Sequence, residues 1–252
     1  MRALPSLAAS LLVAGMPAVA VADQRALAHT YEYATQPEGT TSLQLWFTHR
    51  RISGDAIDGY ADQFEHRLEV EHGLTERWDL GFTTELAQTG RASLLLDRVT
   101  VASRYRFADR AEWPVDLAVA LEASKLLDAS IYPIELRVIA ARDFDRLTLA
   151  ANAIGSLRFG AEVADDVAVG FGWAAGATYL LHDKLRAGVE TWGETGDNRL
   201  VGPRLEDEVR ASIGPVVHLA PSSGFWVTVT AGFGLTDAAD QVAVRAILGI
   251  EL

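Results

Sequence analysis

Hydrophobic and polar residues alternate along most of the chain. From Phe64 to Leu74 the even-numbered positions are mostly apolar, whereas the odd-numbered positions include Glu65, Arg67 and Glu69. Successive side chains of a β-strand point to opposite faces of the sheet, so a period of two predicts a strand with one apolar and one charged face. The same pattern recurs up to the last residues, and no convincing amphipathic helix stands out.

Counting these runs predicts about twelve strands, with boundaries good to about two to four residues. They cover residues 40–51, 60–73, 78–88, 95–107, 113–123, 131–142, 147–156, 167–179, 185–193, 208–219, 225–235 and 241–252.

The connections between the runs fall into two classes. Five are tight and polar, around residues 75–77, 109–110, 144–146, 182–184 and 221–224, and most of the others are longer and rich in Gly, Asp, Glu and Ser. Short turns on one rim and longer loops on the other are typical of an up-and-down antiparallel β-barrel that crosses the bacterial outer membrane, with the short turns in the periplasm. The fold class predicted is therefore an all-β transmembrane barrel.

Aromatic residues gather next to the short turns. Such a ring is typical of the membrane–water interface of a barrel, although aromatic residues also favour strands in general. The predicted membrane-interface aromatics are Trp78, Tyr105, Phe107, Trp113, Phe144, Tyr179, Phe225 and Trp226.

The first residues predict export. Arg2 precedes a short apolar run, and Ala20, Val21 and Ala22 give the small-x-small pattern that signal peptidase accepts. We interpret residues 1–22 as a signal peptide and residues 23–252 as one outer-membrane barrel domain of a Gram-negative bacterium. The 252-residue chain has no Cys and a formal charge of −12, which excludes thiolate chemistry and makes nucleic acid a poor partner.

Three stretches carry a family resemblance. YEYATQPEGTTSLQLWFTHR (residues 31–50), LEVEHGLTERWDLGF (68–82) and GATYLLHDKLRAGVETWG (176–193) resemble small, uncharacterised, porin-like outer-membrane barrel proteins of Gram-negative bacteria. The resemblance implies a strand, a periplasmic turn and a further strand, and no established activity. The chain departs from the pattern by ending in Leu252, where the assembly machinery usually reads a terminal Phe or Trp.

The charged face of the strands is expected to line the lumen, with acids and bases in nearly equal numbers. Cross-strand pairs such as Glu69 or Glu71 with Arg104 or Arg67 would either line a narrow channel or cross-link the lumen into a closed ionic core. The small residues Ala168, Gly170, Gly172, Ala174 and Gly176 point inward and leave room for a solute or for Arg side chains. The predicted pore-lining residues are Glu65, Arg67, Glu69, Glu71, Asp79, Glu85, Arg98, Arg104, Arg106, Glu135, Arg137, Arg186, Glu190, Arg210 and Arg245.

Other chemistry finds little support in the sequence. The acidic residues of the longer loops lack the ligand spacing of a calcium site, so we predict no metal and no cofactor. They are Asp55, Asp58, Asp62, Glu162, Asp165, Asp166, Glu194, Asp197, Glu206, Asp207, Glu208, Asp237 and Asp240. No Gly-x-Ser-x-Gly motif is present, and none of the six His residues lies in a His-x-Ser pattern, so a lipid-hydrolysing enzyme is the least favoured reading.

The sequence therefore favours a small porin-like channel in the cell outer membrane for passive passage of polar solutes. The alternative is a closed structural or interaction barrel with acidic extracellular loops. Expected partners are outer-membrane lipid and lipopolysaccharide, the barrel assembly machinery during insertion, and small polar solutes.

Overall fold

The computed structural model describes residues 25–52, 62–161, 163, 167–195, 198–199, 209–222 and 224–252. The predicted signal peptide and most of the acidic loop residues lie outside this part of the chain. Within it, no helix is long and apolar enough to cross a membrane.

In these described residues, twelve long strands and one two-residue strand form the fold. They are β1 (Thr41–Arg51), β2 (Asp62–Thr75), β3 (Trp78–Thr89), β4 (Leu95–Arg106), β5 (Asp116–Leu126), β6 (Tyr132–Phe144), β7 (Leu147–Phe159), β8 (Val167–His182), β9 (Leu185–Thr195), β10 (Asn198–Arg199), β11 (Val209–Ser222), β12 (Phe225–Gly234) and β13 (Val242–Glu251).

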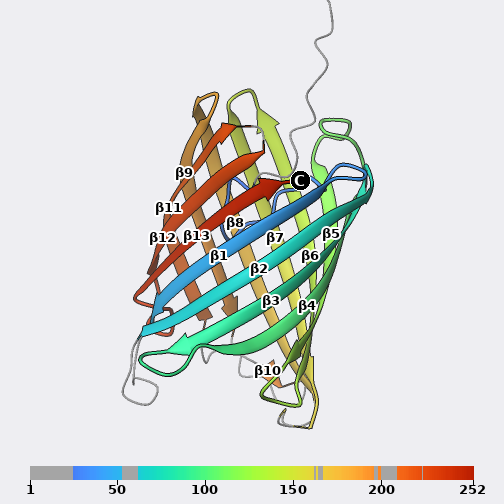
Figure 1. Ribbon diagram of the computed structural model, residues 1–252. Coiled ribbons are helices and arrows are strands. Elements are labelled where there is room, and N and C mark those ends of the chain that lie inside the picture. The colour runs from blue at the N-terminus through green and yellow to red at the C-terminus, as the bar shows by residue number, and fades with distance from the viewer. Residues whose placement is uncertain are drawn as a thin grey trace, which may run out of the picture.

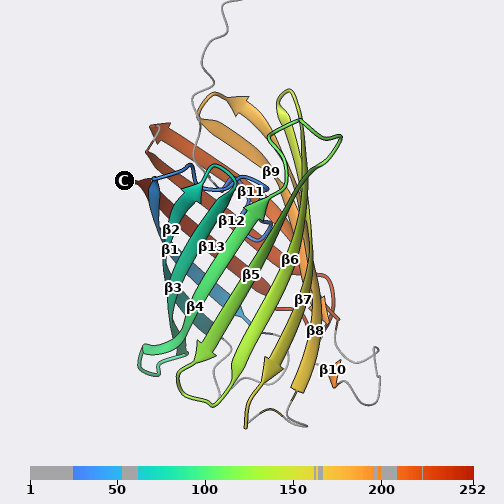
Figure 2. The same ribbon diagram turned by 90° about the vertical axis from the view of Figure 1, so that its right-hand side faces the viewer.

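The long strands close into an antiparallel barrel (Figures 1 and 2). Each pairs with its neighbours in the chain, β8 pairs with β9, and β9 pairs with β11. The first and last strands complete the ring, with Ser42 opposite Glu251 and Arg51 opposite Val242. The two-residue β10 only adds to the end of β8. The prediction of an all-β, up-and-down barrel of about twelve strands is confirmed.

The barrel has an apolar outer face and a polar inner face. Large apolar side chains such as Phe82 (50% exposed) and Val101 (57% exposed) point outward, while Thr83 and Thr100 beside them are buried inside. A soluble protein would bury the apolar face and expose the polar face to water. The arrangement here suits a hydrocarbon environment outside and a polar lumen, because strand pairing satisfies the backbone groups that lipid cannot.

Strand β5 begins later than the alternation predicts. Pro114 has no backbone N–H to donate to a ladder, and Asp116 Oδ1 accepts a hydrogen bond from the N–H of Ala111, which has a φ of 62°. Residues 107–115 therefore form a longer connection on the rim of the short turns. Trp113 lies in this connection rather than in the strand, is exposed, and stacks on Phe107 with ring centroids 6.5 Å apart.

Trp226 corrects the predicted aromatic ring. The other seven predicted residues are exposed, but Trp226 is 0% exposed and packs inside the barrel with Trp46 and Ile247. Phe225 next to it takes the outward position, so the alternation leaves Trp226 on the lumen side. Its indole lies over Gly249 of β13, where a Cβ would stand 2.1 Å from Trp226 Cε2.

This contact predicts the effect of a methyl group at position 249. Gly249→Ala should destabilise the folded barrel by about 1–3 kcal/mol, because the added methyl group overpacks the site. Urea unfolding in lipid vesicles measures the change. The matched control is Gly155→Ala in β7, where nothing lies within 4 Å of the added Cβ. Equal stabilities of the two variants would contradict the packing described, and Trp226→Leu should relieve the Gly249→Ala defect.

Candidate functional site

Residues 25–40, here called the N-terminal segment, lie inside the barrel (Figures 1 and 2). The segment leads into β1 and touches the wall at Gly73, whose carbonyl accepts a hydrogen bond from the N–H of Gly39 at 2.9 Å. A Cβ at Gly73 would stand 2.0 Å from the carbonyl oxygen of Pro37, so this approach requires glycine. The lumen is thus occupied by the chain's own first described residues.

Arg25 is held in a cage of carboxylates and aromatic rings. Its Nη2 lies 3.2 Å from Glu69 Oε1 and 2.9 Å from Glu71 Oε1, and all three side chains are almost fully buried. The Arg25 Cζ lies 4.1 Å from the ring centroid of Tyr31 and 4.9 Å from that of Trp46. Buried charge is tolerated only when paired and hydrogen-bonded, and this cage meets both conditions.

Glu190 of β9 holds the next three residues. Its carboxylate accepts hydrogen bonds from the N–H groups of Ala28 (3.2 Å), His29 (2.9 Å) and Thr30 (3.3 Å). Glu190 is 1% exposed, so these backbone donors replace the water that a carboxylate would otherwise bind. Three successive N–H groups aimed at one carboxylate form a concave anion-binding arrangement of the backbone.

Tyr31 is fixed by three strands. Asn152 of β7 accepts a hydrogen bond from the Tyr31 N–H at 2.6 Å and donates one from Nδ2 to the Tyr31 carbonyl at 2.9 Å. The Tyr31 hydroxyl donates to Glu122 of β5 at 3.2 Å, and burial together with Glu122 raises the pKa of Tyr31 to about 12. Arg137 of β6 lies 4.0 Å from the ring, opposite the contact with Arg25.

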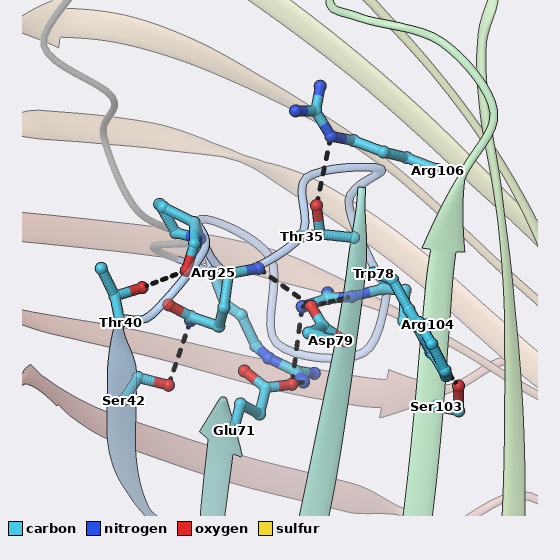
Figure 3. Close-up of polar contacts among 12 residues, drawn as sticks. Arg25, Thr35, Thr40, Ser42, Glu71, Trp78, Asp79, Ser103, Arg104 and Arg106 are labelled. Carbon is cyan, nitrogen blue, oxygen red and sulfur yellow. Dashed lines mark hydrogen bonds and ion pairs between the residues drawn. The ribbon is translucent and has the colours of Figure 1, made fainter. Parts of the chain in front are cut away.

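The end of the segment meets β3 and β4 (Figure 3). The Gln36 N–H donates to Asp79 Oδ2 at 2.9 Å, and Arg104 also donates to that oxygen, through Nη2 at 2.8 Å. Arg106 donates to the Thr35 hydroxyl at 3.1 Å. Asp79 therefore joins the wall to the segment, with a cation on one side and a backbone donor on the other.

Small residues on the wall make room for the apolar part of the segment. Leu27 is 1% exposed and packs in a cluster with Ala118, Ala120 and Ile139. On β8, a Cβ at Gly176 would stand 2.6 Å from Leu27 Cδ2. The inward small residues predicted on β8 do leave space, and a Leu of the chain itself fills part of it.

His29 lies on the other side of the segment. Its ring stacks on Trp192 with centroids 3.7 Å apart and planes inclined by 6°, and Arg245 Nη1 approaches its Nδ1 at 3.2 Å. Since a guanidinium can only donate, Nδ1 must accept, and the imidazole is neutral. Burial, and then the charges of Arg245, Arg137 and Arg50, hold the pKa of His29 well below its ordinary value of 6.5.

The predicted pore-lining residues all take inward positions in the alternation, at different depths. Glu69, Glu71, Asp79, Glu85, Arg104 and Glu190 are buried; Glu65, Arg67, Arg98, Arg106, Glu135, Arg137, Arg186 and Arg245 are partly exposed; Arg210 is exposed at the rim. Whether they line a conducting pore stays a prediction.

Their pairing differs from the sequence expectation. Arg67 pairs with Glu85 at 2.9 Å rather than with Glu69 or Glu71, because Arg67 on β2 lies directly opposite Glu85 on β3. Glu71 does lie 3.6 Å from Arg104, but Glu69 pairs with Arg25. Nothing in the alternation of the sequence places Arg25 in the lumen.

A pocket remains between the segment and strands β2 to β5. Its cavity volume is about 20 Å³, which is enough for about one water molecule. It is lined by Tyr31, Arg67, Glu69, Glu71, Asp79, Gly81, Thr83, Thr100, Ala102, Ser103, Arg104, Ala120 and Glu122. In the described part of the chain, no cluster of three or more His, Asp or Glu residues could hold a metal ion.

The barrel shape is shared with solved outer-membrane structures. The COG4313 outer membrane channel from Pseudomonas putida F1 matches with a TM-score of 0.68 and 11% identity, over 87% of this chain and 98% of that chain. The NanC porin matches with a TM-score of 0.59 and 10% identity over 83% of this chain and 100% of that chain. The KdgM porin in complex with disordered oligogalacturonate matches with a TM-score of 0.57 and 10% identity, over 83% of this chain and 97% of that chain.

These likenesses establish the fold. The coarser part of the sequence resemblance, to porin-like outer-membrane barrels, agrees with them. No protein family matches the chain by sequence, and no curated protein matches it.

The contacts of Glu190 predict how firmly the segment is held. Glu190→Gln should expose the segment to chymotrypsin at Tyr31 and Tyr33, because the amide replaces one acceptor by a donor and weakens three charge-assisted bonds of about 1.5–3 kcal/mol each. Mass spectrometry of the digested barrel in lipid measures the cleavage rate. Glu194→Gln, farther along the same strand and half-exposed, is the control and should leave the rate unchanged. Resistance of Glu190→Gln equal to that of the wild type would refute this role.

His29 predicts a pH dependence. Its pKa is lower inside the barrel than in a released segment, so the neutral imidazole favours the bound segment above pH 6.5, and this contribution is lost as the pH falls through the lower value. Between pH 7 and pH 4, the melting temperature of the wild type should fall further than that of His29→Gln, because glutamine does not titrate in this range. Identical slopes in circular dichroism melts would exclude His29 as the titrating group.

Proposed function

We propose that the protein is an outer-membrane channel for small polar solutes, and that the N-terminal segment occupies its lumen as a removable closure. One observation carries the proposal above all others: what fills the middle of the barrel is a separate stretch of chain, not the side chains of the wall alone. A closed structural barrel would need no such stretch.

The hydrogen-bonding of the wall supports removal of the segment. Each long strand is paired on both sides by other strands, so the ladder of the barrel is complete without residues 25–36. The contacts of these residues with the wall are made largely with wall side chains, such as Glu190, Asn152 and Asp79. Their departure would leave the strand pairing intact.

The wall that the segment covers suits polar solutes. Acidic and basic residues face each other across short distances, as in Arg67 with Glu85 and Arg104 with Asp79. Fixed charges of both signs exert a transverse electric field on a passing solute. The small Thr and Gly residues between these charges leave space in the passage. The mechanism is diffusion past these charges, with no covalent step.

A closed interaction barrel is the second candidate. The number of bonds that hold the segment favours it, since each must be broken before a solute passes. Lipid hydrolysis is the third reading, and the structures with the same fold reported above are channels and porins rather than enzymes.

Planar-bilayer recordings decide between channel and closed barrel. The protein without residues 25–36 should show sustained, discrete conductance steps, whereas the full chain should open rarely. Before recording, circular dichroism and shifted mobility of the unheated protein on gels verify that the shortened barrel is folded and inserted.

A substitution at the rim serves as the control. Arg91→Ala, exposed in the connection between β3 and β4 and outside the predicted pore lining, should leave the rare openings of the full chain unchanged. A shortened barrel that is folded, inserted and silent would refute the channel and favour the interaction barrel.

A further inference from the structure

We propose that Glu69, Glu71 and Trp46 form a guanidinium-binding site on the barrel wall, which Arg25 occupies in this structure and which a guanidinium-bearing solute takes when the segment leaves. The proposal rests on the proposed function and deepens it, because it names a class of solute: organic cations with a guanidinium group, such as free arginine or an arginine-containing peptide.

The wall side of the site is formed without the segment. Glu71 Oε2 accepts a hydrogen bond from Gln44 Nε2 at 2.7 Å, which leaves Oε1 for the cation. Trp46 is 3% exposed. The Cζ atoms of Arg67 and Arg245 lie 5.0 Å and 5.4 Å from its ring centroid, so neighbouring side chains fix the indole. Such preorganisation lowers the cost of binding.

The charges around the site require a cation. Arg104 lies 3.6 Å from Glu71 and 2.8 Å from Asp79, while Arg67 is bonded to Glu85. Without Arg25, Glu71 keeps Arg104, which is already bound to Asp79, and Glu69 keeps the field of Arg67, which is bonded to Glu85. Two buried carboxylates that lose their shared counter-ion must take up a proton or bind another cation, and a cationic solute meets this requirement.

The geometry favours a guanidinium over an ammonium group. Both carboxylates contact the same guanidinium nitrogen of Arg25, and its Cζ lies 4.9 Å from the ring centroid of Trp46, so the wall uses the face of a planar, weakly hydrated cation, whereas an ammonium is a strongly hydrated point charge. Glu69 Oε2 is buried and accepts no hydrogen bond in this structure, so the site has an acceptor that Arg25 leaves unused.

The lining of the small pocket next to the cage is acidic. Its ionisable lining includes Glu69, Glu71, Asp79 and Glu122 against Arg67 and Arg104, so acids outnumber bases. Once the segment has left, a cation larger than guanidinium can extend from the cage along β3 and β4, into the space that the segment occupied, without meeting a surplus of positive charge.

Chemical rescue tests the site in the full chain. Arg25→Ala leaves a space the size of a guanidinium between Tyr31, Trp46 and the two carboxylates. Ethylguanidinium chloride should bind this variant in isothermal titration calorimetry at matched ionic strength and raise its melting temperature. Propylammonium chloride, of similar size, should bind at least about tenfold more weakly, because it loses the stacking of a planar cation on the aromatic rings and is more strongly hydrated.

Substitution of the wall provides the matched control. Arg25→Ala/Glu69→Gln/Glu71→Gln should lose ethylguanidinium binding by at least about tenfold, and Arg25→Ala/Trp46→Leu covers the case in which the triple variant does not fold. Equal binding of ethylguanidinium to Arg25→Ala and to these folded variants, equal binding of the two cations, or no binding at all would overturn the proposal.

The calorimetric result is independent of conductance. If the barrel without residues 25–36 is silent while ethylguanidinium binds Arg25→Ala, the channel is refuted and the binding site is not. If that barrel conducts but millimolar ethylguanidinium neither binds nor reduces the potassium current, the site is refuted and the channel is not.

Discussion

The ionised side chains on the inner face of the barrel must find hydrogen-bonding partners, because a carboxylate buried without them carries a large desolvation penalty. The wall meets part of this requirement by itself, through pairs such as Arg67 with Glu85. It does not meet all of it for Glu190, which accepts hydrogen bonds from three backbone N–H groups of the N-terminal segment as well as from Thr230 of the wall. The same holds for Glu69, which pairs with Arg25. The closed arrangement depends on this pairing of acceptors on the wall with donors on the segment.

Other features of the fold also make room for the segment against the wall. Gly73 allows the backbone of residues 36 and 37 to approach the wall, and Gly176 leaves space for Leu27. Neither position needs glycine for a strand alone. Apolar contacts hold Leu27, and ionic or hydrogen-bonded contacts hold Arg25 and Tyr31, so the segment is fixed along its length and not only where it joins β1. In the proposed channel, opening would require water or a solute to replace these donors.

The alternation of side chains made much of the fold predictable. Strand number, the outward apolar face and the inward positions of Glu69 and Glu190 follow from a period of two. The rule failed where backbone chemistry interrupts a strand, as Pro114 does before β5. The prediction for Trp226 is wrong for another reason: nearness to a turn does not set the face on which a side chain lies, and the alternation gives the outward position to Phe225.

The N-terminal segment was not predictable in the same way. Its contacts join residues more than a hundred positions apart, such as Tyr31 with Asn152, and no local period records them. The one available signal was the stretch after the predicted cleavage site, with Arg25, Tyr31 and Tyr33 ahead of the first alternating run. Side chains of this kind suggest a packed segment, but the sequence does not say against what.

Hydrogen exchange at the segment's backbone tests the central claim most directly. In lipid nanodiscs at neutral pH, the amides of Ala28, His29, Thr30 and Tyr31 should exchange far more slowly than those of an unstructured peptide. In Glu190→Ala, the first three of these amides should exchange faster. Exchange of all four amides at the rate of a free peptide in the wild-type barrel would show that the wall does not hold the segment and would contradict the account.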